Sequence, residues 1–355
     1  MKVLYLTKYS RMAGSSRLRS FQYFPYLEKK GIKVKVHSFF DDEYLKDLYA
    51  GKRNLMAVLK SYARRFFVLF TVFKYDVIVI EKEIFPYFPA WAEYLLQLIG
   101  KKYIVDYDDA IFHNYDQSKN IFIRKFLGKK IDKVMKYASI VVAGNSYLAE
   151  RAEKSGAKQI EIIPTVTDIN RYPVKSYSKI EKYIVGWIGT KSTFEKHLYP
   201  CKEWILEAQK IDDVEFHIIG ITEDQGLGNK VKYIPWKEDS EVENIHQFDV
   251  GIMPLEDSVW ERGKCSYKII QYFSCGIPSI ASPVGMNKEV IEEGVNGFLA
   301  ATPQEWLSKI QFLKNNKEET IRLGTAARKK VEENYCIQIT AKQWFEIFNK
   351  VYGFN

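Results

Sequence analysis

The sequence comprises 355 residues, of which 46% are apolar, and it carries a formal net charge of +9. At roughly 150 residues per domain, this length predicts two domains that each bury a hydrophobic core. No apolar run reaches the roughly 18 residues that a membrane-spanning helix needs. The four cysteines are scattered and include no C-x-x-C pair, which argues against a zinc site or a disulfide framework.

The predicted elements of the first half alternate between apolar strands and helices. The opening segment, residues 2–7, is expected to be a strand and not a secretion signal, which indicates a cytoplasmic protein. Further strands are predicted at 33–39, 76–80, 102–106, 140–143 and 159–163. Helices are predicted at 17–29, 90–99, 121–137 and 146–155, with a long basic helical region ending near 74. This βαβ alternation predicts a parallel sheet with both faces covered.

The alternation pauses at a polar stretch, residues 175–182, which predicts a linker. Beyond it, strands are predicted at 183–188, 214–219, 232–234, 250–253, 278–281 and 297–300, and helices at 199–209, 268–274, 303–314, 317–334 and 339–352. The predicted fold class is therefore α/β, with two doubly wound, Rossmann-like domains facing a central cleft. We expect the first domain to span 1–170 and the second 171–338, with the C-terminal helix, about 339–355, packing back on the first.

Positive charge is concentrated in the first of these domains. Residues 1–170 hold 29 Lys and Arg against 18 Asp and Glu, a net charge of +11, so the remainder carries −2. Such a domain suits nucleic acid, anionic lipid or a phosphorylated substrate, and a solvated basic helix face is an equally open explanation. The cations expected to meet an anionic surface are Arg64, Arg65, Lys129 and Lys130.

Ligands of doubly wound sheets bind beyond the carboxyl ends of the strands, and the first such loop is GSSRLR at 14–19. Gly14 would let a ligand approach the backbone, and Arg17 at a predicted helix start suggests an anionic partner. A solvated arginine is the open alternative. The loop matches neither G-x-G-x-x-G nor G-K-[ST], which argues against a dinucleotide site or a P-loop.

The second loop places three carboxylates within four residues after the strand predicted at 102–106. Asp109 is the best candidate to act on an acceptor hydroxyl, followed by Asp108, whereas Asp106 is expected to satisfy the local backbone. A metal-binding Asp dyad is an alternative, and we prefer a role without metal. His113 is the histidine nearest these acids and is the next candidate base.

Two further segments supply candidate contacts in the second half. Gly189, Thr190 and Lys191 follow the strand at 183–188, where a packing role for glycine is an equal alternative. The segment GKCSYKIIQYFSCGIPSIAS, residues 263–282, brings two lysines and a hydroxyl to the start of a predicted helix, an arrangement suited to phosphate. Solvated lysines in an ordinary α/β unit are the alternative. The candidates here are Lys264, Ser266, Tyr267, Lys268 and Gln271.

Over its full length the sequence resembles the retaining glycosyltransferases of family 4, the glycosyl transferases group 1, which have the GT-B fold. The resemblance rests on KVLYLTKYS, GSSRLRS, VDYDDAIF, VVAGNSYLAERA, IVGWIGTKST and RLGTAARKKVEENY, and above all on FDVGIMPLEDSVWERGKCSYKIIQYFSCGIPSIASPVGMNKEVIEEGVNGFLA. Gly263 and Gln271 stand where many members carry a pair of glutamates. An Arg…Lys pair after the first strand of the second domain is missing, and Lys264 and Lys268 would replace its charge.

The resemblance implies transfer of a sugar from a nucleotide diphosphate sugar to a glycan or lipid-linked acceptor, with retained configuration, in cell-surface polysaccharide or glycoconjugate assembly. It implies no metal, no cofactor and no protein nucleophile, since the leaving phosphate can accept the acceptor's proton. The implied donor-binding residues are Gly14, Gly189, Thr190, Lys191, Lys264, Ser266, Tyr267, Lys268 and Gln271. By their position at or near the carboxyl ends of the first domain's strands, the candidate catalytic residues are Asp109, Asp108, Arg17 and His113.

Such an enzyme is expected in the cytoplasm, peripheral on the inner face of the cell membrane, with an anionic membrane surface but no nucleic acid among its partners. Two other functions stay open. A GT-B-like nucleotide-sugar epimerase would release an epimerised product without any acceptor. A non-catalytic module would use the basic face for binding alone, although the sequence offers no recognised nucleic-acid motif.

Overall fold

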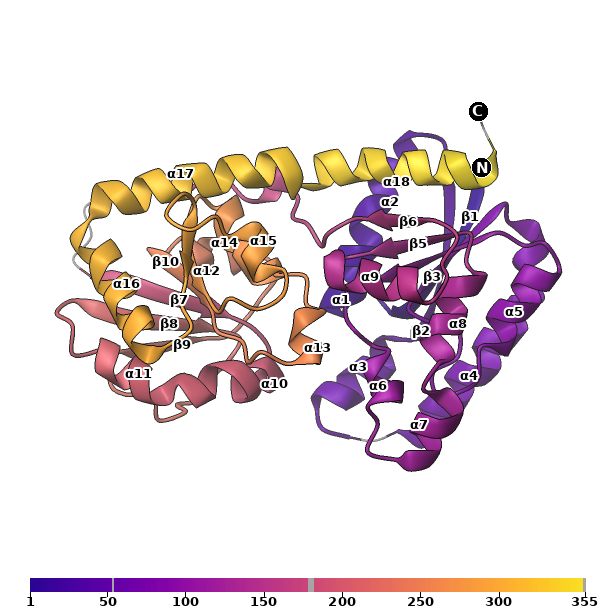
Figure 1. The fold of residues 1–355 in the computed structure, drawn as a ribbon, viewed down its shortest axis with the longest axis horizontal. Coiled ribbons are helices and arrows are strands. Elements are labelled where there is room, and N and C mark those ends of the chain that lie inside the picture. The colour runs from indigo at the N-terminus through magenta and orange to yellow at the C-terminus, as the bar shows by residue number, and fades with distance from the viewer. Residues whose placement is uncertain (53, 178–181, 354–355) are drawn as a thin grey trace. The chain divides into compact units, whose positions relative to one another are not determined.

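The computed structural model describes residues 1–52, 54–177 and 182–353. The chain divides by its internal contacts into two compact units (Figure 1). Unit 1 comprises Met1–Thr165, Gly263–Cys265 and Ile339–Asn355, and unit 2 comprises Val166–Arg262 and Ser266–Gln338. Residues 178–181 of the predicted linker and residues 354–355 of the predicted C-terminal helix lie outside the described residues.

Unit 1 is built on a six-stranded parallel sheet with the order β2-β1-β3-β4-β5-β6. Every residue of the central strands β3, β4 and β5 is buried. Because successive side chains of a strand point to opposite faces, both faces of this sheet must be covered. The strands are β1 (Lys2–Tyr9), β2 (Lys33–Phe40), β3 (Val77–Glu81), β4 (Tyr103–Tyr107), β5 (Ile140–Ala143) and β6 (Ile160–Ile162).

Short helices connect the strands of unit 1. The α-helices are α1 (Gly14–Arg19), α2 (Phe24–Lys29), α3 (Asp42–Tyr49), α4 (Leu55–Leu69), α5 (Trp91–Leu98), α6 (His113–Asp116), α7 (Ile121–Leu127), α8 (Lys130–Tyr137) and α9 (Ser146–Lys154). Two 3₁₀ turns, η1 (Phe21–Tyr23) and η2 (Val72–Lys74), complete these connections. The long basic region predicted to end near residue 74 is thus mainly α4, a helix of 15 residues.

Unit 2 repeats the architecture, with a six-stranded parallel sheet in the order β12-β11-β10-β7-β8-β9. Its strands are β7 (Tyr183–Ile188), β8 (Val214–Ile219), β9 (Val231–Ile234), β10 (Val250–Met253), β11 (Ser279–Ala281) and β12 (Gly297–Leu299). Its helices are η3 (Ile169–Arg171), α10 (Lys191–Thr193), η4 (Phe194–Leu198), η5 (Tyr199–Cys201), α11 (Lys202–Ala208), α12 (Glu241–Ile245), α13 (Val259–Arg262), α14 (Tyr267–Ser274), α15 (Asn287–Val290), α16 (Pro303–Asn315) and α17 (Lys317–Asn334). The predicted α/β class, with two doubly wound Rossmann-like units, is confirmed.

The C-terminal helix α18 (Ile337–Tyr352) supplies core side chains to unit 1. Trp344 and Phe348 are buried, and the Phe348 ring centroid lies 6.4 Å from that of Tyr5 in β1. The hydroxyls of Tyr23 and Thr340 lie 2.9 Å apart and form a buried hydrogen bond. The end of the chain is therefore part of the first sheet's packing (Figure 1).

Two predicted helices are divided in the structure. The helix predicted at 17–29 becomes α1, η1 and α2, because Pro25 in the first turn of α2 has no N–H to donate to a preceding turn. The helix predicted at 121–137 separates into α7 and α8 at Gly128, where glycine weakens a helix by about 1 kcal/mol relative to alanine.

Two of the four cations expected to meet an anionic surface are buried instead. Arg65 is fully buried and donates from Nη2 to backbone carbonyls of β1 and β2, over 2.7 and 3.0 Å. Lys130 is buried against Glu83, with which it forms an ion pair. Arg64 bonds to Asp41 over 3.0 Å. The expectation is therefore wrong for Arg65 and Lys130, whose charges hold the interior of unit 1 together.

Candidate active site

A lysine and a group of carboxylates meet at the carboxyl edge of the unit 1 sheet. The strand order reverses between β1 and β3, and ligands of open α/β sheets bind at such a switch point. Lys82 directly follows β3, and Asp108 and Asp109 directly follow the neighbouring β4. Two predicted site residues, Asp108 and Asp109, therefore lie beside Lys82, which was not predicted from the sequence.

The Lys82 ammonium group holds this cluster together. Its Nζ lies 2.9 Å from Asp108 Oδ1, 3.3 Å from Ser15 Oγ and 4.0 Å from Asp109 Oδ2. The side chain is buried, and the backbone adopts φ 71°, a left-handed conformation that costs a residue with a Cβ about 1–2 kcal/mol. Burial alone would lower the pKa of Lys82, but Asp108 and Asp109 raise it well above its ordinary value, so the charge is retained.

The two aspartates differ in the direction in which their pKa values are shifted and in their exposure. Burial alone would raise the pKa of Asp108, but the Lys82 charge outweighs it and holds the pKa at about 2. Ser15 Oγ also donates to Asp108 Oδ2 over 2.6 Å. Burial and the Asp108 charge raise the pKa of Asp109 above its ordinary value. The Asp109 side chain is 32% exposed against 11% for Asp108, so Asp109 is the more accessible of the two carboxyl groups.

A buried glutamate completes the group. Glu81, the last residue of β3, accepts a hydrogen bond from Ser16 Oγ over 2.9 Å and one from the Lys8 backbone N–H over 3.3 Å. Burial raises the pKa of Glu81 to about 7, although the Lys82 charge opposes this. Glu81 and Lys82 were missed, yet they follow an apolar strand as Asp108 does, so the same positional rule would have selected them.

Asp106 forms a buried ion pair with Arg19 of α1. Arg19 Nε donates to Asp106 Oδ2 over 3.0 Å, and Arg19 Nη1 donates to the Ile163 carbonyl over 2.7 Å. Both side chains are buried. Burial alone would lower the pKa of Arg19, but the Asp106 charge raises it. The expectation that Asp106 satisfies its local backbone is therefore wrong, because its partner lies on a different element.

The helix α1 carries two predicted site residues, Gly14 and Arg17. A Cβ on Gly14 would meet no atom within 4 Å, so the space beside this glycine is open. Arg17 lies in the last turn of the six-residue helix and not at its start. Because a helix favours cations near its C-terminus, the dipole argument for an anionic partner of Arg17 is wrong.

His113 begins α6, and both of its ring nitrogens are engaged. Nδ1 lies 2.8 Å from Asp116 Oδ1, and Nε2 lies 2.9 Å from the Tyr147 hydroxyl. The ring also packs against Phe112, with centroids 4.4 Å apart. These contacts leave no ring nitrogen for an acceptor, so we assign His113 no part in the proposed reaction.

The segment Gly263–Cys265 belongs to unit 1, so the predicted donor segment at 263–282 is divided between the units. Asn145 Nδ2 donates to the Lys264 carbonyl over 3.0 Å, and Cys265 Sγ donates to the Asp108 carbonyl over 3.0 Å. The Lys264 charge acts on Asp109, whose pKa it lowers against the larger effects of burial and Asp108.

Gly263 packs closely against another segment of unit 1. A Cβ at this position would lie 2.5 Å from the Ala110 Cβ and 2.8 Å from the Ala110 backbone nitrogen. No larger side chain fits without movement of the backbone beside Asp109. Close packing therefore explains why this chain has glycine here.

In unit 2 the strand order reverses between β7 and β10, and three predicted residues follow β7. A Cβ on Gly189 would lie 2.4 Å from the Trp187 ring, so packing alone requires a glycine here. Thr190 caps the short helix α10 through a capping box with Thr193. Lys191 is the exposed first residue of α10.

The helix α14 carries the other predicted donor residues: Ser266 precedes it, and Tyr267, Lys268 and Gln271 lie within it. Ser266 has φ 48°, is buried and donates from Oγ to Asn287 Oδ1 over 2.7 Å. Lys268 Nζ lies 5.5 Å from the Trp187 ring centroid.

Gln271 faces a buried hydrogen-bonded cluster. Its Nε2 lies 3.0 Å from Glu241 Oε1 and 3.2 Å from the Tyr172 hydroxyl. Tyr172 donates to the same Glu241 oxygen over 2.6 Å, and Trp236 Nε1 donates to the other over 2.6 Å. A neutral amide suits this position, since a glutamate there would face the Glu241 carboxylate.

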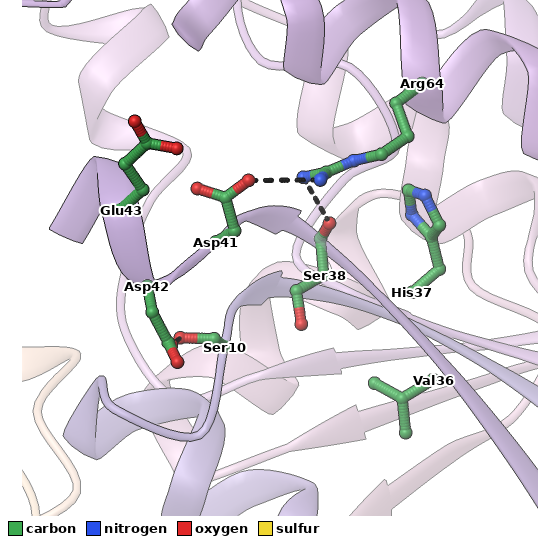
Figure 2. A pocket seen from close by; sticks show the side chains of 8 residues that line it. All are labelled: Ser10, Val36, His37, Ser38, Asp41, Asp42, Glu43 and Arg64. Atoms are coloured by element: carbon green, nitrogen blue, oxygen red, sulfur yellow. Dashed lines mark hydrogen bonds and ion pairs between the residues drawn. The ribbon is translucent and has the colours of Figure 1, made fainter.

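A pocket of about 410 Å³ lies beside the carboxyl end of β2 in unit 1 (Figure 2). Arg64 Nη1 donates to Asp41 Oδ2 over 3.0 Å, and Ser10 donates to Asp42. Burial and the charges of Arg65 and Arg64 lower the pKa of His37 to about 4, so its ring is neutral near pH 7. The lining residues are Ser10, Val36, His37, Ser38, Asp41, Asp42, Glu43 and Arg64.

Candidate metal ligands do not cluster in the part of the chain that the structure describes. Nowhere in residues 1–52, 54–177 and 182–353 do three His, Cys, Asp or Glu side chains gather closely enough to hold an ion. Over the same residues, no helix is both long and apolar enough to cross a bilayer.

Comparison with known proteins identifies relatives of both the sequence and the fold. Residues 182–316 match the family described as Glycosyl transferases group 1. The spore coat protein SA of Bacillus subtilis is 34% identical over 80 residues, which are 22% of this chain and 21% of that protein. This chain thus matches only about a fifth of that relative's length.

Solved structures resemble the chain over its full length. A sucrose-phosphate synthase from Thermosynechococcus elongatus superimposes with a TM-score of 0.73 at 13% identity, covering 100% of both chains. A glycosyltransferase from Rickettsia africae gives 0.70 at 14%, covering 100% of this chain and 99% of the other. HepE of Anabaena, crystallised with UDP-glucose, gives 0.69 at 17%, covering 99% and 100%. These likenesses establish a shared fold, which is GT-B.

Proposed function

We propose that this chain, which matches the group 1 glycosyl transferases over residues 182–316, transfers a sugar from a nucleotide diphosphate sugar to a glycan or lipid-linked acceptor with retained configuration. The family match is the observation that carries the proposal, because it covers β7, α14 and the strands between them. The structure of HepE with UDP-glucose supports a nucleotide sugar as the donor.

We assign donor binding to the region 171–338, which includes Lys264. Negative charge builds on the leaving diphosphate, and fixed cations and helix N–H groups lower the barrier to its departure. Lys268 stands in the first turn of α14, an eight-residue helix without an acidic residue in that turn. Thr190 and Lys191 supply further donors at the neighbouring switch point, and Gln271 would contact the ribose as a neutral partner.

We assign the acceptor to the region 1–170, with Asp109 as the residue that orients the reacting hydroxyl. Its raised pKa and partial exposure suit a carboxylate that accepts a hydrogen bond from a neutral alcohol. Asp108, held as an anion by Lys82, is a positioning residue. The leaving phosphate accepts the proton from the acceptor as the glycosidic bond forms, so the step needs no protein nucleophile.

The cellular role we propose is assembly of a cell-surface polysaccharide or glycoconjugate, in the cytoplasm and at the inner face of the membrane. The net charge of +11 on residues 1–170 supports this placement, because a basic protein is attracted to an anionic leaflet.

A panel of nucleotide diphosphate sugars tests the proposal. Thermal shift identifies the donors that stabilise the chain, and each of these is incubated with and without oligosaccharide and lipid-linked acceptors. We expect acceptor-dependent release of nucleoside diphosphate. Failure of every donor to bind, or an epimerised donor formed without acceptor, would contradict the proposal.

A further inference from the structure

The helix α4 exposes its apolar side and buries its polar side. The residues that it buries are Ser61 and the cation Arg65. Leu55, Leu59 and Phe67 are 76%, 63% and 67% exposed. A helix on a water-soluble surface normally shows the opposite arrangement, with charges outward and leucine and phenylalanine inward. The outward stripe of α4 therefore suits an apolar surrounding.

The helix α7 also exposes large apolar side chains. Its Phe122 and Phe126 are 69% and 73% exposed, and Ile121 is 61% exposed. The loop before α5 adds Phe88, which is 50% exposed. Scattered apolar side chains are normal on a protein surface, but such a concentration of large ones marks an interaction site.

Contacts within unit 1 connect these elements. The ring of Tyr62 in α4 lies 5.3 Å from that of Phe88, and the neighbouring Tyr87 ring lies 5.6 Å from Tyr115 of α6. The helix α6 in turn contacts α7. We call this region the α4–α7 face, represented by Leu59, Phe67, Phe70, Phe88, Phe122 and Phe126.

Two stretches of the sequence that contain α4 and α7 carry cations and no carboxylates. The sequence contains no Asp or Glu from 48 to 75 or from 117 to 131. Exposed lysines lie within both stretches, including Lys60, Lys74, Lys125 and Lys129. Apolar side chains flanked by lysines match the boundary between acyl chains and anionic headgroups in a lipid leaflet.

We infer that the α4–α7 face inserts into the surface of an anionic lipid bilayer, with its phenylalanines and leucines at the acyl boundary and its lysines on lipid phosphates. This differs from attraction by net charge alone, because two of the basic residues first expected to take part are buried and the apolar side chains supply the contact. A second copy of the chain fits less well, since each face would bring its lysines against those of the other.

The inference deepens the proposed function, because a lipid-linked acceptor would be met at this surface. It can nevertheless fail independently, since lipid binding is measured without any sugar. Transfer to a soluble acceptor, measured separately, reports on the proposed function alone.

Flotation with vesicles tests the inference on the full chain. Vesicles of phosphatidylcholine alone are compared with vesicles that also contain phosphatidylglycerol, at about 0.1 M and about 1 M NaCl, where the Debye length is about 10 Å and 3 Å. The variant Leu59→Ser/Phe67→Ser/Phe70→Ser removes the α4 stripe, and Phe122→Ser/Phe126→Ser removes that of α7. The matched control, Leu206→Ser/Phe312→Ser, changes exposed apolar residues of unit 2.

The wild-type chain should float with the anionic vesicles and retain part of that binding at high salt, as apolar insertion requires. Each variant of the face should bind at least about tenfold more weakly, while the control binds like wild type. Unchanged unfolding temperatures would show that the variants fold. The inference would be overturned if both variants floated like the wild type, or if the wild type did not float at all. It would also be overturned if the wild type were a dimer that the triple substitution dissociates.

Discussion

At the scale of single residues, Lys82 decides which aspartate is available to a ligand. Its ammonium group and the Ser15 hydroxyl both bind Asp108, which keeps that carboxylate ionised and occupied. Asp109 is left at the edge of the group with a raised pKa. The buried charge and the left-handed backbone of Lys82 are unfavourable by themselves, and such strain concentrates at functional sites.

Substitution of the two aspartates should therefore give different results. Asp109→Asn should lower the rate of transfer by roughly 10²-fold and leave donor affinity nearly unchanged, as measured by steady-state kinetics and calorimetry. Asp108→Asn leaves the buried Lys82 charge without its partner, so it should mainly destabilise the chain, by about 3–5 kcal/mol in denaturant titration. The exposed Glu150→Gln is the matched control. A fully active Asp109→Asn enzyme would show that the acceptor is oriented elsewhere.

Removal of the Lys82 charge should alter the pH dependence of the reaction. In Lys82→Met, Asp109 loses a cation that lowers its pKa, so its carboxylate should be protonated up to a higher pH. The acidic limb of the pH–rate profile should then move upward, whereas Lys133→Met, at an exposed lysine of the same unit, should leave it in place. A lower rate with an unmoved acidic limb would mean that Lys82 serves folding alone.

Glu81 should make stability depend on pH in the opposite direction to Asp108. Its pKa rises from an ordinary 4.5 to about 7 on folding, so between these values the folded chain binds a proton that the unfolded chain lacks. The free energy of unfolding should therefore fall as pH rises from 4.5 to 7, by up to about 3 kcal/mol. Glu81→Gln should remove this part of the decline when denaturation is compared at both ends of that window. An identical decline in wild type and variant would contradict the assignment.

At the scale of elements, α14 combines several features suited to a diphosphate. Its first turn carries Lys268, its preceding residue is fixed by Asn287, and its inner side is closed by the Gln271–Glu241–Tyr172 cluster. The sequence predicted this helix correctly, because a polar approach, an apolar stretch and Gly276 mark its start and end. The role of Lys268 stays a prediction. The buried partners of Gln271 come from distant positions, and no local pattern indicates them.

The lysines of the donor segment can be tested by binding alone. Lys264→Ala and Lys268→Ala should each weaken nucleoside diphosphate binding by about 1–3 kcal/mol, the scale of charge-assisted hydrogen bonds, in isothermal titration calorimetry. Lys329→Ala, at a lysine with 74% of its side chain exposed, provides the control. Wild-type affinity in both variants would remove these lysines from the proposed donor site.

At the scale of the whole molecule, periodicity was sufficient to predict the fold but not the electrostatic arrangement of the site. Apolar strands and their spacing led to two parallel sheets, because each buried strand has a continuous apolar run. The helix breaks at Pro25 and Gly128 were not predicted, because the apolar pattern of a whole segment does not show the effect of a single residue. The pairing of Asp106 with Arg19 depends on strand order, which brings together side chains 87 residues apart in sequence.

Sequence patterns also do not show which basic residues of the first half are buried and which are exposed. Composition treats every lysine and arginine as equal, whereas Arg65 and Lys130 are buried and Lys129 is exposed. Only the packed chain shows that α4 turns its arginine inward and its phenylalanines outward. A total charge therefore predicts at most a kind of partner, and the α4–α7 face that we infer depends on which side chains the packed chain exposes.

The stereochemistry of the product tests the central claim most directly. Transfer by the wild-type enzyme, with a donor chosen from the binding panel, can be followed by proton NMR of the anomeric signal from the first turnovers. The account predicts that the new glycosidic bond has the anomeric configuration of the donor and forms only when acceptor is present. A product of inverted configuration, or an epimerised sugar released without acceptor, would contradict it.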